Sequence, residues 1–406
     1  MNSIFKKICL FTGLASLLVS LTACSGDNKV KKEILDSDSD NEASVAILTD
    51  SKKDDFEAYD ASMAIKEQYG VKKKNKLTKA QMVDYHLPNK DMTNYEKDKK
   101  RVLDKIKENR EIKGLVVSTS DPNIISALKE LKKSRKDMLL VSADQATSID
   151  KNTTDNKTKD VAAGTRDLMD TFDMNFKTAQ PDRTKRIAEL AKTLGAERTI
   201  AIVDDNLSAS VKLNLDGLDS ETKSYGMAYE EVSLPKLEAN EKVAYVSNLI
   251  DEMTKKYGDK VNYYPTSKLI DDILISRITE NNFYVAELSQ PNKLADILDK
   301  YSIKYIHRQR YEYAYLNSQV STFLSRINDS GNRMGSSSAD PKNHTLRMAL
   351  ELAVNITGKG TDIEKCYNPY FLEKISTFRI KLNAAFSNVS KGTKNYKQVD
   401  PDPYIY

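Results

Sequence analysis

Tryptophan is absent from this 406-residue sequence, and cysteine and histidine each occur only three times. His86, His307 and His344 lie far apart, and neither HxxxH nor CxxC spacing occurs, so the sequence predicts no metal site. No GxSxG elbow, Walker loop or GxGxxG turn is present, which removes the usual templates for acyl transfer and nucleotide binding. We therefore expect a protein that is not an enzyme and has no cofactor, although separated carboxylates could still form a glycosidase site.

An excess of one charge is also missing. Lys and Arg total 63 against 59 Asp and Glu, which gives a formal net charge of +4. Loss of Lys6 and Lys7 with a signal segment would lower this to about +2, with both signs well mixed along the chain. The sequence therefore does not predict a nucleic-acid partner.

A second long apolar run is lacking as well, and the single one lies near the start. Lys6 and Lys7 precede ICLFTGLASLLVSL, and the small residues that follow end at Cys24 in the sequence LTAC. The run is shorter than the ~20 residues that cross a bilayer as a helix. Its order of positive, apolar and small residues is typical of a secretory signal. We therefore predict a signal peptide at residues 1–23.

The LTAC segment resembles a bacterial lipobox. The resemblance implies cleavage before Cys24, a diacylglyceryl thioether on that cysteine and an acyl chain such as palmitate on the new N-terminus. It predicts a lipoprotein anchored on the extracytoplasmic face of the cell membrane. The alternative is an ordinary secreted protein with a chance cysteine at the cleavage point.

The segment after Cys24 is rich in Asp, Ser, Asn and Lys and has few apolar residues, so it predicts a flexible tether at residues 24–42. Cys9 would leave with the signal and Cys24 would carry the lipid. Cys366 then remains as the single thiol, and no internal disulfide is expected.

Short apolar segments alternate with longer amphipathic segments through the rest of the chain, which is typical of βα units and parallel sheets. The alternation runs twice, and the length also suggests two domains. The predicted fold class is therefore α/β, with two doubly wound parallel-sheet lobes. The expected strands are residues 44–50, 81–87, 114–120, 138–144, 199–205, 226–233, 261–267 and 283–288.

The predicted domain organisation follows from this alternation. Residues 167–176, DLMDTFDMNF, are expected to form an extended crossing segment. Residues beyond about Ser390 are polar and are expected to be loosely packed. The expected divisions are a first lobe at 43–180, a second lobe at 181–305, a C-terminal segment at 306–390 that crosses back to the first lobe, and a tail at 391–406.

Two helix boundaries have clear signals. Gly195 follows the amphipathic stretch PDRTKRIAELAKTL and is expected to end that helix. Asp121 precedes Pro122, which predicts Asp121 as an N-cap with proline in the first helical position.

The starts of the two lobes also resemble each other. Residues 45–51, VAILTDS, and residues 200–206, IAIVDDN, each contain an apolar strand that ends in Asp before a helix. Patterns this short recur by chance, so the repeat supports two similar lobes only weakly.

The segments LMDTFDMNF followed by TKRIAELAKTLGAERTIAIV, and NRMG followed by HTLRMALELAVNI, resemble a bacterial lipoprotein family of unknown function, domain-of-unknown-function family 3798. That family has a type 1 periplasmic-binding-protein-like fold, akin to the basic-membrane-protein solute-binding lipoproteins. The resemblance covers roughly residues 43–385. It implies that a small ligand is bound, and it specifies no catalytic motif.

Ligands of open parallel sheets bind at the carboxyl ends of the strands, where backbone N–H groups and helix N-termini converge. The candidate side chains are polar and partly acidic, which favours ligands rich in hydroxyl or amino groups over strongly anionic ones. The candidate ligand-binding residues are Asp50, Ser51, Ser118, Thr119, Ser120, Asp144, Gln145, Asp204, Asn206, Tyr264, Thr266 and Glu287.

Each candidate also has a purely structural interpretation. Ser, Thr, Asp and Asn at these turns commonly cap helices, which stabilises a helix by ~1 kcal/mol without any ligand. Asp50 and Asp204 end the paired strands and have the stronger case for function. Tyr264 adjoins a proline turn and could equally be a packed core residue.

The functional hypothesis is a monomeric, lipid-anchored, solute-binding protein that captures a small polar ligand, nucleoside-like or sugar-like, between two lobes and delivers it to a membrane permease. Closure is expected to be a hinge motion at segments 167–182 and 301–311. One alternative is a surface sensor or assembly lipoprotein of the same fold, with a sensor kinase as partner and no transport role. Another is an enzyme that acts on glycosides.

Overall fold

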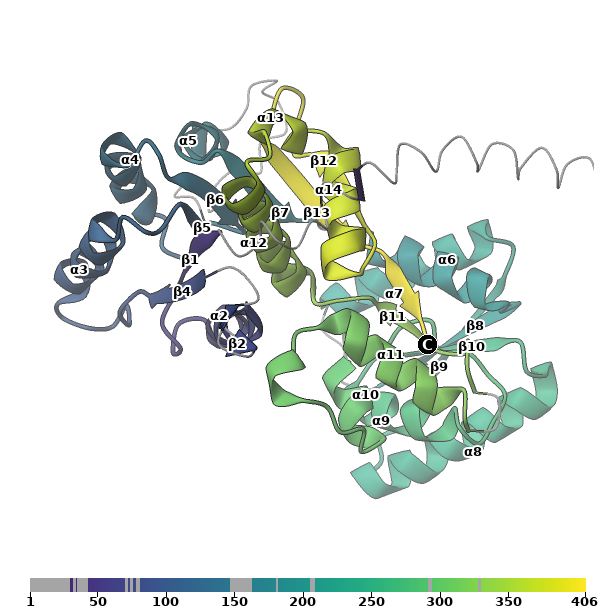
Figure 1. The fold of residues 1–406 in the computed structure, drawn as a ribbon. Coiled ribbons are helices and arrows are strands. Elements are labelled where there is room, and N and C mark those ends of the chain that lie inside the picture. The colour runs from purple at the N-terminus through teal and green to yellow at the C-terminus, as the bar shows by residue number, and fades with distance from the viewer. Residues whose placement is uncertain are drawn as a thin grey trace, which may run out of the picture. The chain divides into compact units, whose positions relative to one another are not determined.

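The computed structural model describes residues 43–69, 81–146, 163–179, 182–204, 209–290, 294–327 and 330–406, with the short pieces 30–31, 34, 72–73 and 76–77 (Figure 1). The predicted signal and Cys24 lie outside the described residues, as does most of the predicted tether. Ile34, within that tether, is fully buried, and its carbonyl oxygen accepts a hydrogen bond from Lys359. The prediction of a solvated tether is therefore wrong at this residue.

The described chain forms two compact units. The first contains residues up to Tyr59, Tyr69–Phe176 and Leu346–Lys397. The second contains Asp60–Gln68, Lys177–Thr345 and Gln398–Tyr406. The C-terminal part thus returns to the first unit at Leu346, later than the predicted residue 306.

The first unit contains a seven-stranded sheet with the order β12-β13-β7-β6-β5-β1-β4. Strand β1 pairs in parallel with β4 and β5, and the parallel pairing continues through β6 to β7. The strands are β1 (Ser44–Thr49), β4 (Gln81–His86), β5 (Gly114–Ser118), β6 (Leu139–Ala143), β7 (Met174–Thr178), β12 (Ala384–Asn388) and β13 (Tyr396–Pro401).

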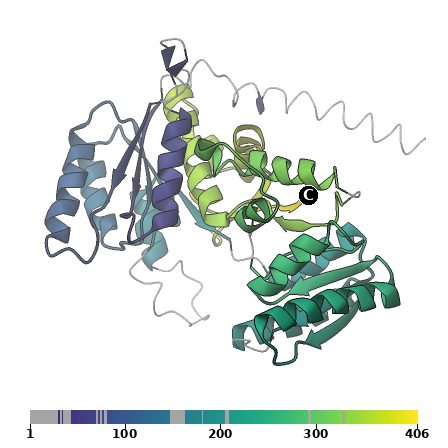
Figure 2. The ribbon, with the colours of Figure 1, turned by 90° about the horizontal axis from the view of Figure 1, so that it is seen from below.

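Helices cover both faces of this sheet, so its central strands are buried on both sides (Figures 1 and 2). All six residues of β1 and all five of β5 are buried, as expected for a doubly wound parallel sheet. The helices and short helical turns are α2 (Phe56–Tyr69), α3 (Tyr95–Glu108), α4 (Ile124–Ser134), α5 (Ala163–Thr171), α12 (Pro341–Lys359), α13 (Ile363–Cys366), α14 (Pro369–Ile375) and η3 (Ser376–Ile380). Two short strands, β2 (Lys72–Lys73) and β3 (Lys76–Leu77), pair in antiparallel fashion.

The packing of α4 shows how the sequence forms one layer. Ile124, Leu128 and Leu131 recur at spacings of four and three residues, so they lie on one side of the helix. All three are buried in a core cluster with Leu103 of α3 and Leu115 of β5. The opposite side of α4 carries lysines.

The second unit contains a smaller parallel sheet with the order β10-β8-β9. Its strands are β8 (Arg198–Val203), β9 (Ala228–Ser233) and β10 (Val261–Pro265). Its helices are α6 (Arg183–Leu194), α7 (Ala209–Ser224), α8 (Ala239–Tyr257), α9 (Lys268–Arg277), α10 (Leu294–Lys300), α11 (Tyr313–Leu324) and the 3-10 turn η2 (His307–Gln309). Two short strands, β11 (Gly335–Ser337) and β14 (Pro403–Ile405), pair in antiparallel fashion.

Helix α6 has the predicted boundaries. The side chain of Asp182 accepts hydrogen bonds from the backbone N–H groups of Thr184 and Lys185. Gly195 ends the helix with φ of 102°, a left-handed conformation that glycine adopts without steric cost. Both features follow directly from the local sequence.

Three further predictions about single segments are wrong. Residues 167–176 do not form one extended crossing segment, because residues up to Thr171 belong to α5, and Leu168 of α5 and the following Phe172 are buried in the same core cluster before β7 begins. Residues 283–288 form only isolated bridges, Asn262 to Tyr284 and Val285 to Met334, and no full strand.

The third error is the expected tail at 391–406. Strand β13 lies between β7 and β12 in the first sheet. Tyr396 is 6% exposed and Val399 is fully buried, so this polar segment still contributes apolar side chains to the sheet. Tyr406 is 2% exposed and belongs to the core of the second unit.

No helix among the described residues is long and apolar enough to cross a membrane.

Candidate functional site

Asp50 is the central residue at the carboxyl edge of the first sheet. It follows β1 directly and is 0% exposed. Its Oδ2 atom accepts hydrogen bonds from the backbone N–H of Ser120 at 2.8 Å and from the Ser120 hydroxyl. Its Oδ1 atom is buried and has no hydrogen-bond partner among the residues that the structure describes. Because an unsatisfied buried acceptor costs free energy, this oxygen is suited to a donor that arrives from outside the fold.

Lys90 provides the nearest positive charge. Its Nζ atom lies 3.4 Å from Asp50 Oδ2 and donates a hydrogen bond to the Ser120 hydroxyl. The lysine side chain is one-third exposed, so the pair lies just beneath the surface. One oxygen of Asp50 is thus engaged by the protein, and the other faces no donor.

The loops after β1 and β4 are joined beside this pair. The Ser51 hydroxyl donates to Asp54 Oδ2 at 2.6 Å, and the same oxygen accepts from the backbone N–H of Lys90 at 3.1 Å. Lys53 forms an ion pair with Asp91 at 2.7 Å. Ser51 therefore shapes the loop around Asp50, in line with its structural interpretation.

His86 is the last residue of β4 and lies at the same carboxyl edge of the sheet. Its Nδ1 atom lies 2.8 Å from the Thr49 hydroxyl, and its Nε2 atom lies 3.2 Å from Asp84 Oδ2. The ring of Tyr59 lies against the imidazole with centroids 4.2 Å apart. These contacts hold the imidazole in a fixed position.

Thr119 and Gln145 link the ends of β5 and β6. Gln145 Oε1 accepts from the backbone N–H and the hydroxyl of Thr119 at 3.2 and 3.0 Å. Its amide group donates to the carbonyl oxygens of Asp121 and Ala146. Both side chains are nearly fully buried and engaged, so they act as structural supports. Ser118 is also buried, at the end of β5.

Asp121 is held by its own fold. It accepts hydrogen bonds from the Tyr95 hydroxyl at 2.8 Å and from Lys99 Nζ at 2.9 Å. Burial opposes ionisation, but the bonds from Lys99 and Tyr95 outweigh it and hold the pKa of Asp121 below its usual value. Helix α4 starts later than predicted, with Asn123 in the cap position and Asp121 Oδ1 accepting from its N–H.

Asp144 has an unusual backbone. Its φ of 51° lies in the left-handed region, which costs a non-glycine residue energy but is tolerated by Asp. Its N–H donates to the Phe176 carbonyl oxygen at 2.9 Å. The strained turn places Asp144, half-exposed, at the same edge as Asp50.

The second unit has a related pair at the carboxyl edge of its own sheet. Asp204 follows β8 and forms an ion pair with Lys242 at 2.7 Å. The Thr266 hydroxyl, after β10, accepts from the backbone N–H of Asp204 at 2.9 Å and donates to the Ile202 carbonyl at 3.1 Å. Thr266 therefore positions Asp204. Asn206 lies outside the described residues.

Arg183 joins two other candidates in the second unit. Its Nε donates to Glu287 Oε1 at 3.0 Å, and its guanidinium donates to the Leu288 carbonyl at 2.7 Å. It also lies over the Tyr264 ring, with the guanidinium carbon 5.8 Å from the centroid. Burial raises the pKa of Glu287 in spite of Arg183, and burial likewise raises the pKa of Tyr264.

Arg183 was not predicted from the sequence, because it lies in the first turn of α6 and is 104 residues from its partner Glu287. A charged residue directly after an N-cap was the available signal. Glu287 and Tyr264 lie together as predicted, although residues around Glu287 form no strand.

The two Asp–Lys pairs match in topology. Each aspartate ends the first strand of its sheet in chain order, and each lysine follows a neighbouring strand. The separations along the chain are 40 residues for Asp50–Lys90 and 38 for Asp204–Lys242. The weak repeat between residues 45–51 and 200–206 therefore corresponds to a repeated local arrangement.

Glu351 is a third buried carboxylate, in the first unit, and differs from Asp50. Arg347 Nε and Arg379 Nε donate to its two oxygens at 3.0 and 2.9 Å, and the Tyr69 hydroxyl donates to Oε1. Burial opposes its charge, yet the two arginines lower its pKa to about 2. Both oxygens are engaged, so Glu351 serves the fold.

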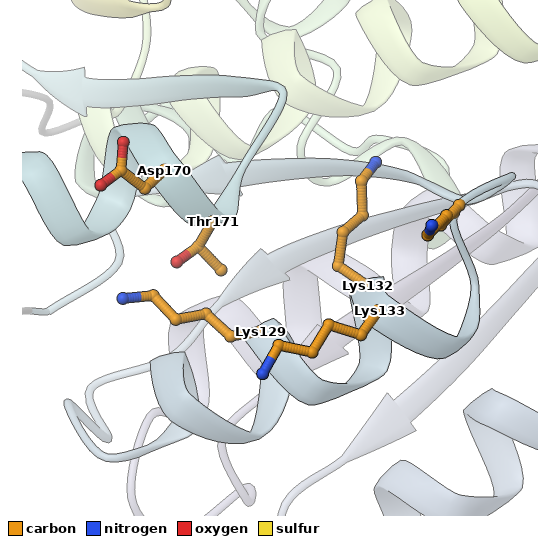
Figure 3. A pocket seen from close by; sticks show the side chains of 6 residues that line it. Lys129, Lys132, Lys133, Asp170 and Thr171 are labelled. Atoms are coloured by element: carbon orange, nitrogen blue, oxygen red, sulfur yellow. The ribbon is translucent and has the colours of Figure 1, made fainter.

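Figure 3 shows a hollow of about 410 Å³ between α4 and α5, lined by lysines together with Asp170 and Thr171. Three of its four lysines are neutralised nearby: Lys129 pairs with Asp167 at 2.7 Å and Lys132 with Asp173 at 2.6 Å. Lys133 pairs with Glu130 on its own helix. The surface has mixed charge, so we do not assign it to an anionic ligand.

Among the residues that the structure describes, no group of three or more His, Cys, Asp or Glu side chains could hold a metal ion.

Comparison with known proteins places the chain in context. The model of a family described as "protein of unknown function (DUF3798)" matches residues 44–335. No curated protein matches the chain.

Solved structures resemble the chain to different degrees. A protein from Clostridium difficile 630, named as a candidate transcriptional regulator, aligns with a TM-score of 0.65 at 21% identity over 90% of this chain and 99% of that one. A sugar ABC transporter protein from Actinomyces odontolyticus ATCC 17982 aligns with a TM-score of 0.42 at 9% identity, covering 90% and 96% of the two chains. An ABC transporter solute-binding protein from Bradyrhizobium sp. BTAi1 aligns with a TM-score of 0.36 at 10% identity, covering 79% and 78%. The predicted α/β fold with parallel sheets is confirmed.

Proposed function

The chain belongs to the family of proteins of unknown function (DUF3798), and on that premise we propose that it is a solute-binding protein that captures a small polar molecule without transforming it. Asp50 carries the proposal. A fully buried carboxylate with one oxygen engaged and one without a partner provides an acceptor that a ligand hydroxyl or amino group can satisfy.

The local charge supports a donor-bearing ligand. Lys90 offsets the charge of Asp50, and Ser120 holds Oδ2 in place, so the free oxygen needs a hydrogen bond more than it needs a cation. A phosphate or sulfate would face this carboxylate and be repelled. Nucleoside-like and sugar-like solutes have the required hydroxyl groups.

The proposal includes no chemical step. An acid–base pair needs a second carboxyl group near the first. Asp121 and Asp54, two further carboxylates at this edge, are held by Lys99 and Tyr95 and by Ser51 and the Lys90 backbone, respectively.

Thermal denaturation of the full chain with nucleosides, sugars and amino acids tests the proposal. We expect at least one probe to raise the Tm of the wild type and to lose that effect in Asp50→Asn, because the amide can place a donor against the ligand's donor. Asp167→Asn, a half-exposed carboxylate on α5 of the same unit, is the matched control and should respond like the wild type. Equal responses of Asp50→Asn and the wild type would contradict the proposal.

The proposed setting is the extracytoplasmic face of the membrane, with a monomeric body anchored through lipid on Cys24 and a membrane permease as receiver. The LTAC segment supports the anchor. Expression in a bacterium with a tagged palmitate analogue should label the wild type but not Cys24→Ala. Label on both chains, or on neither, would contradict the lipid anchor. A sensor kinase in place of a permease is the competing partner, and crosslinking in membranes would distinguish them.

A further inference from the structure

We infer that the solute received by the first unit is a small molecule that bears an aromatic ring together with a hydroxyl or amino donor, and not a plain polyol or an inorganic ion. This inference rests on the proposed function and names the ligand class for the same site.

Exposed apolar side chains flank the polar pair. Among the described residues, seven large apolar side chains stand exposed to solvent, and two of them are Phe56, 55% exposed, and Met92, 50% exposed. Phe56 begins α2 after the loop that follows Asp50, and Met92 lies in the loop that carries Lys90. Exposed large apolar groups near convergent polar groups are typical of ligand sites.

The two loops are held together, so both apolar side chains belong to one edge. The Lys90 backbone N–H donates to Asp54 Oδ2 at 3.1 Å, and Lys53 pairs with Asp91 at 2.7 Å. Carboxyl ends of parallel strands lie on the same edge of a sheet. Phe56 and Met92 therefore belong to the two tied loops that follow Asp50 and carry Lys90.

These groups divide the recognition into two parts. Asp50 Oδ1 accepts a donor from the polar part of the solute. An aromatic ring and a flexible thioether instead favour contact with a planar or apolar ring. A small polyol would satisfy Asp50 and leave both apolar side chains in water.

The second unit repeats the combination independently. Val243, 39% exposed, and Tyr245, 37% exposed, lie on α8 within three residues of Lys242, the partner of Asp204. Four of the seven exposed apolar side chains thus accompany the two Asp–Lys pairs.

Titration calorimetry of the full chain tests the inference with probes matched in their donors: adenosine against D-ribose, and tyramine against ethanolamine. Adenosine and tyramine each bear an aromatic ring, and D-ribose and ethanolamine do not. We expect the aromatic member of at least one pair to bind at least tenfold more tightly than its non-aromatic partner. Phe56→Ala and Met92→Ala should each weaken the ring-bearing probe by about tenfold. Tyr370→Ala, which removes a 47% exposed aromatic from α14 of the same unit, is the control and should bind like the wild type.

The outcomes separate the two proposals. Ribose or ethanolamine binding as tightly as the ring-bearing partner, with Phe56→Ala unchanged, would overturn the ring inference and leave solute binding intact. Absence of heat from all four probes would overturn both the ring inference and the proposal of solute binding. Tight binding of the ring-bearing probes that persists in both alanine variants would assign the ring to other side chains and contradict this site.

Discussion

The Asp50–Lys90 and Asp204–Lys242 pairs occupy the same topological position in two different units and are built differently. Asp50 is fully buried, its lysine is 3.4 Å away, and one oxygen lacks a partner. Asp204 is partly exposed, and its lysine lies closer, at 2.7 Å. The comparison teaches that equal topology does not imply equal availability: the first pair keeps an acceptor open, whereas the second is a tighter ion pair.

The largest effect on stability is expected at Glu351, a buried carboxylate whose two oxygens are both hydrogen-bonded. Glu351→Gln should lower the free energy of unfolding by about 3–5 kcal/mol near neutral pH, because two arginines lose their charge partner. The folded pKa of Glu351 is lowered to about 2, so its stabilisation is complete above the unfolded pKa near 4.5 and disappears as the pH falls toward 2. Urea denaturation at pH 7 and pH 3 measures both effects. A loss below 1 kcal/mol at pH 7 would contradict the assignment.

The next largest effect should separate the two aspartates in ligand binding. Asp50→Asn should weaken a bound solute by about 100-fold, because the ligand donor loses its acceptor. Asp204→Asn should weaken it by less than about tenfold, since Lys242 already engages that carboxylate. Calorimetry with the tightest ring-bearing probe measures both. Equal losses of affinity in the two variants would show that the two aspartates contribute equally to ligand binding.

The variants must be compared at one pH, because the titration of His344 changes the free energy of unfolding. Burial lowers the pKa of His344 to about 4 in the folded protein, against 6.5 when unfolded. The unfolded chain therefore takes up the proton first, so this stabilisation is present above pH 6.5 and declines as the pH falls toward 4. We expect a loss of about 2 kcal/mol between pH 7 and pH 5. His344→Gln should flatten this slope, which denaturation curves at both pH values would show; an unchanged slope would assign the effect to other groups.

The smallest expected difference concerns the two lysines. Lys242→Met should destabilise the protein by about 1 kcal/mol, because both partners of its ion pair are largely shielded. Lys90→Met should cost less than about 0.5 kcal/mol, because Lys90 is one-third exposed and its ion pair is longer. Chemical denaturation of the two variants side by side measures the difference. A larger cost at Lys90 would reverse the proposed roles.

The sequence predicted the elements that local chemistry controls. The apolar strands before Asp50 and Asp204 and the end of α6 at Gly195 are confirmed. Each depends on neighbouring residues alone: apolar runs or a glycine with positive φ.

Features that depend on distant residues were not predictable. Nothing near Lys90 indicates that it lies beside Asp50, because the contact arises from the pairing of β1 with β4. The Arg183–Glu287 ion pair joins residues 104 positions apart. Strand β13 has too few apolar residues to show a pattern, and its burial comes from its neighbours β7 and β12.

The position of residues 396–406 also has a consequence for biosynthesis. Strand β13 completes the first sheet between β7 and β12, and β14 pairs with β11 in the second unit. Neither unit can therefore reach its final form until these last residues have left the ribosome.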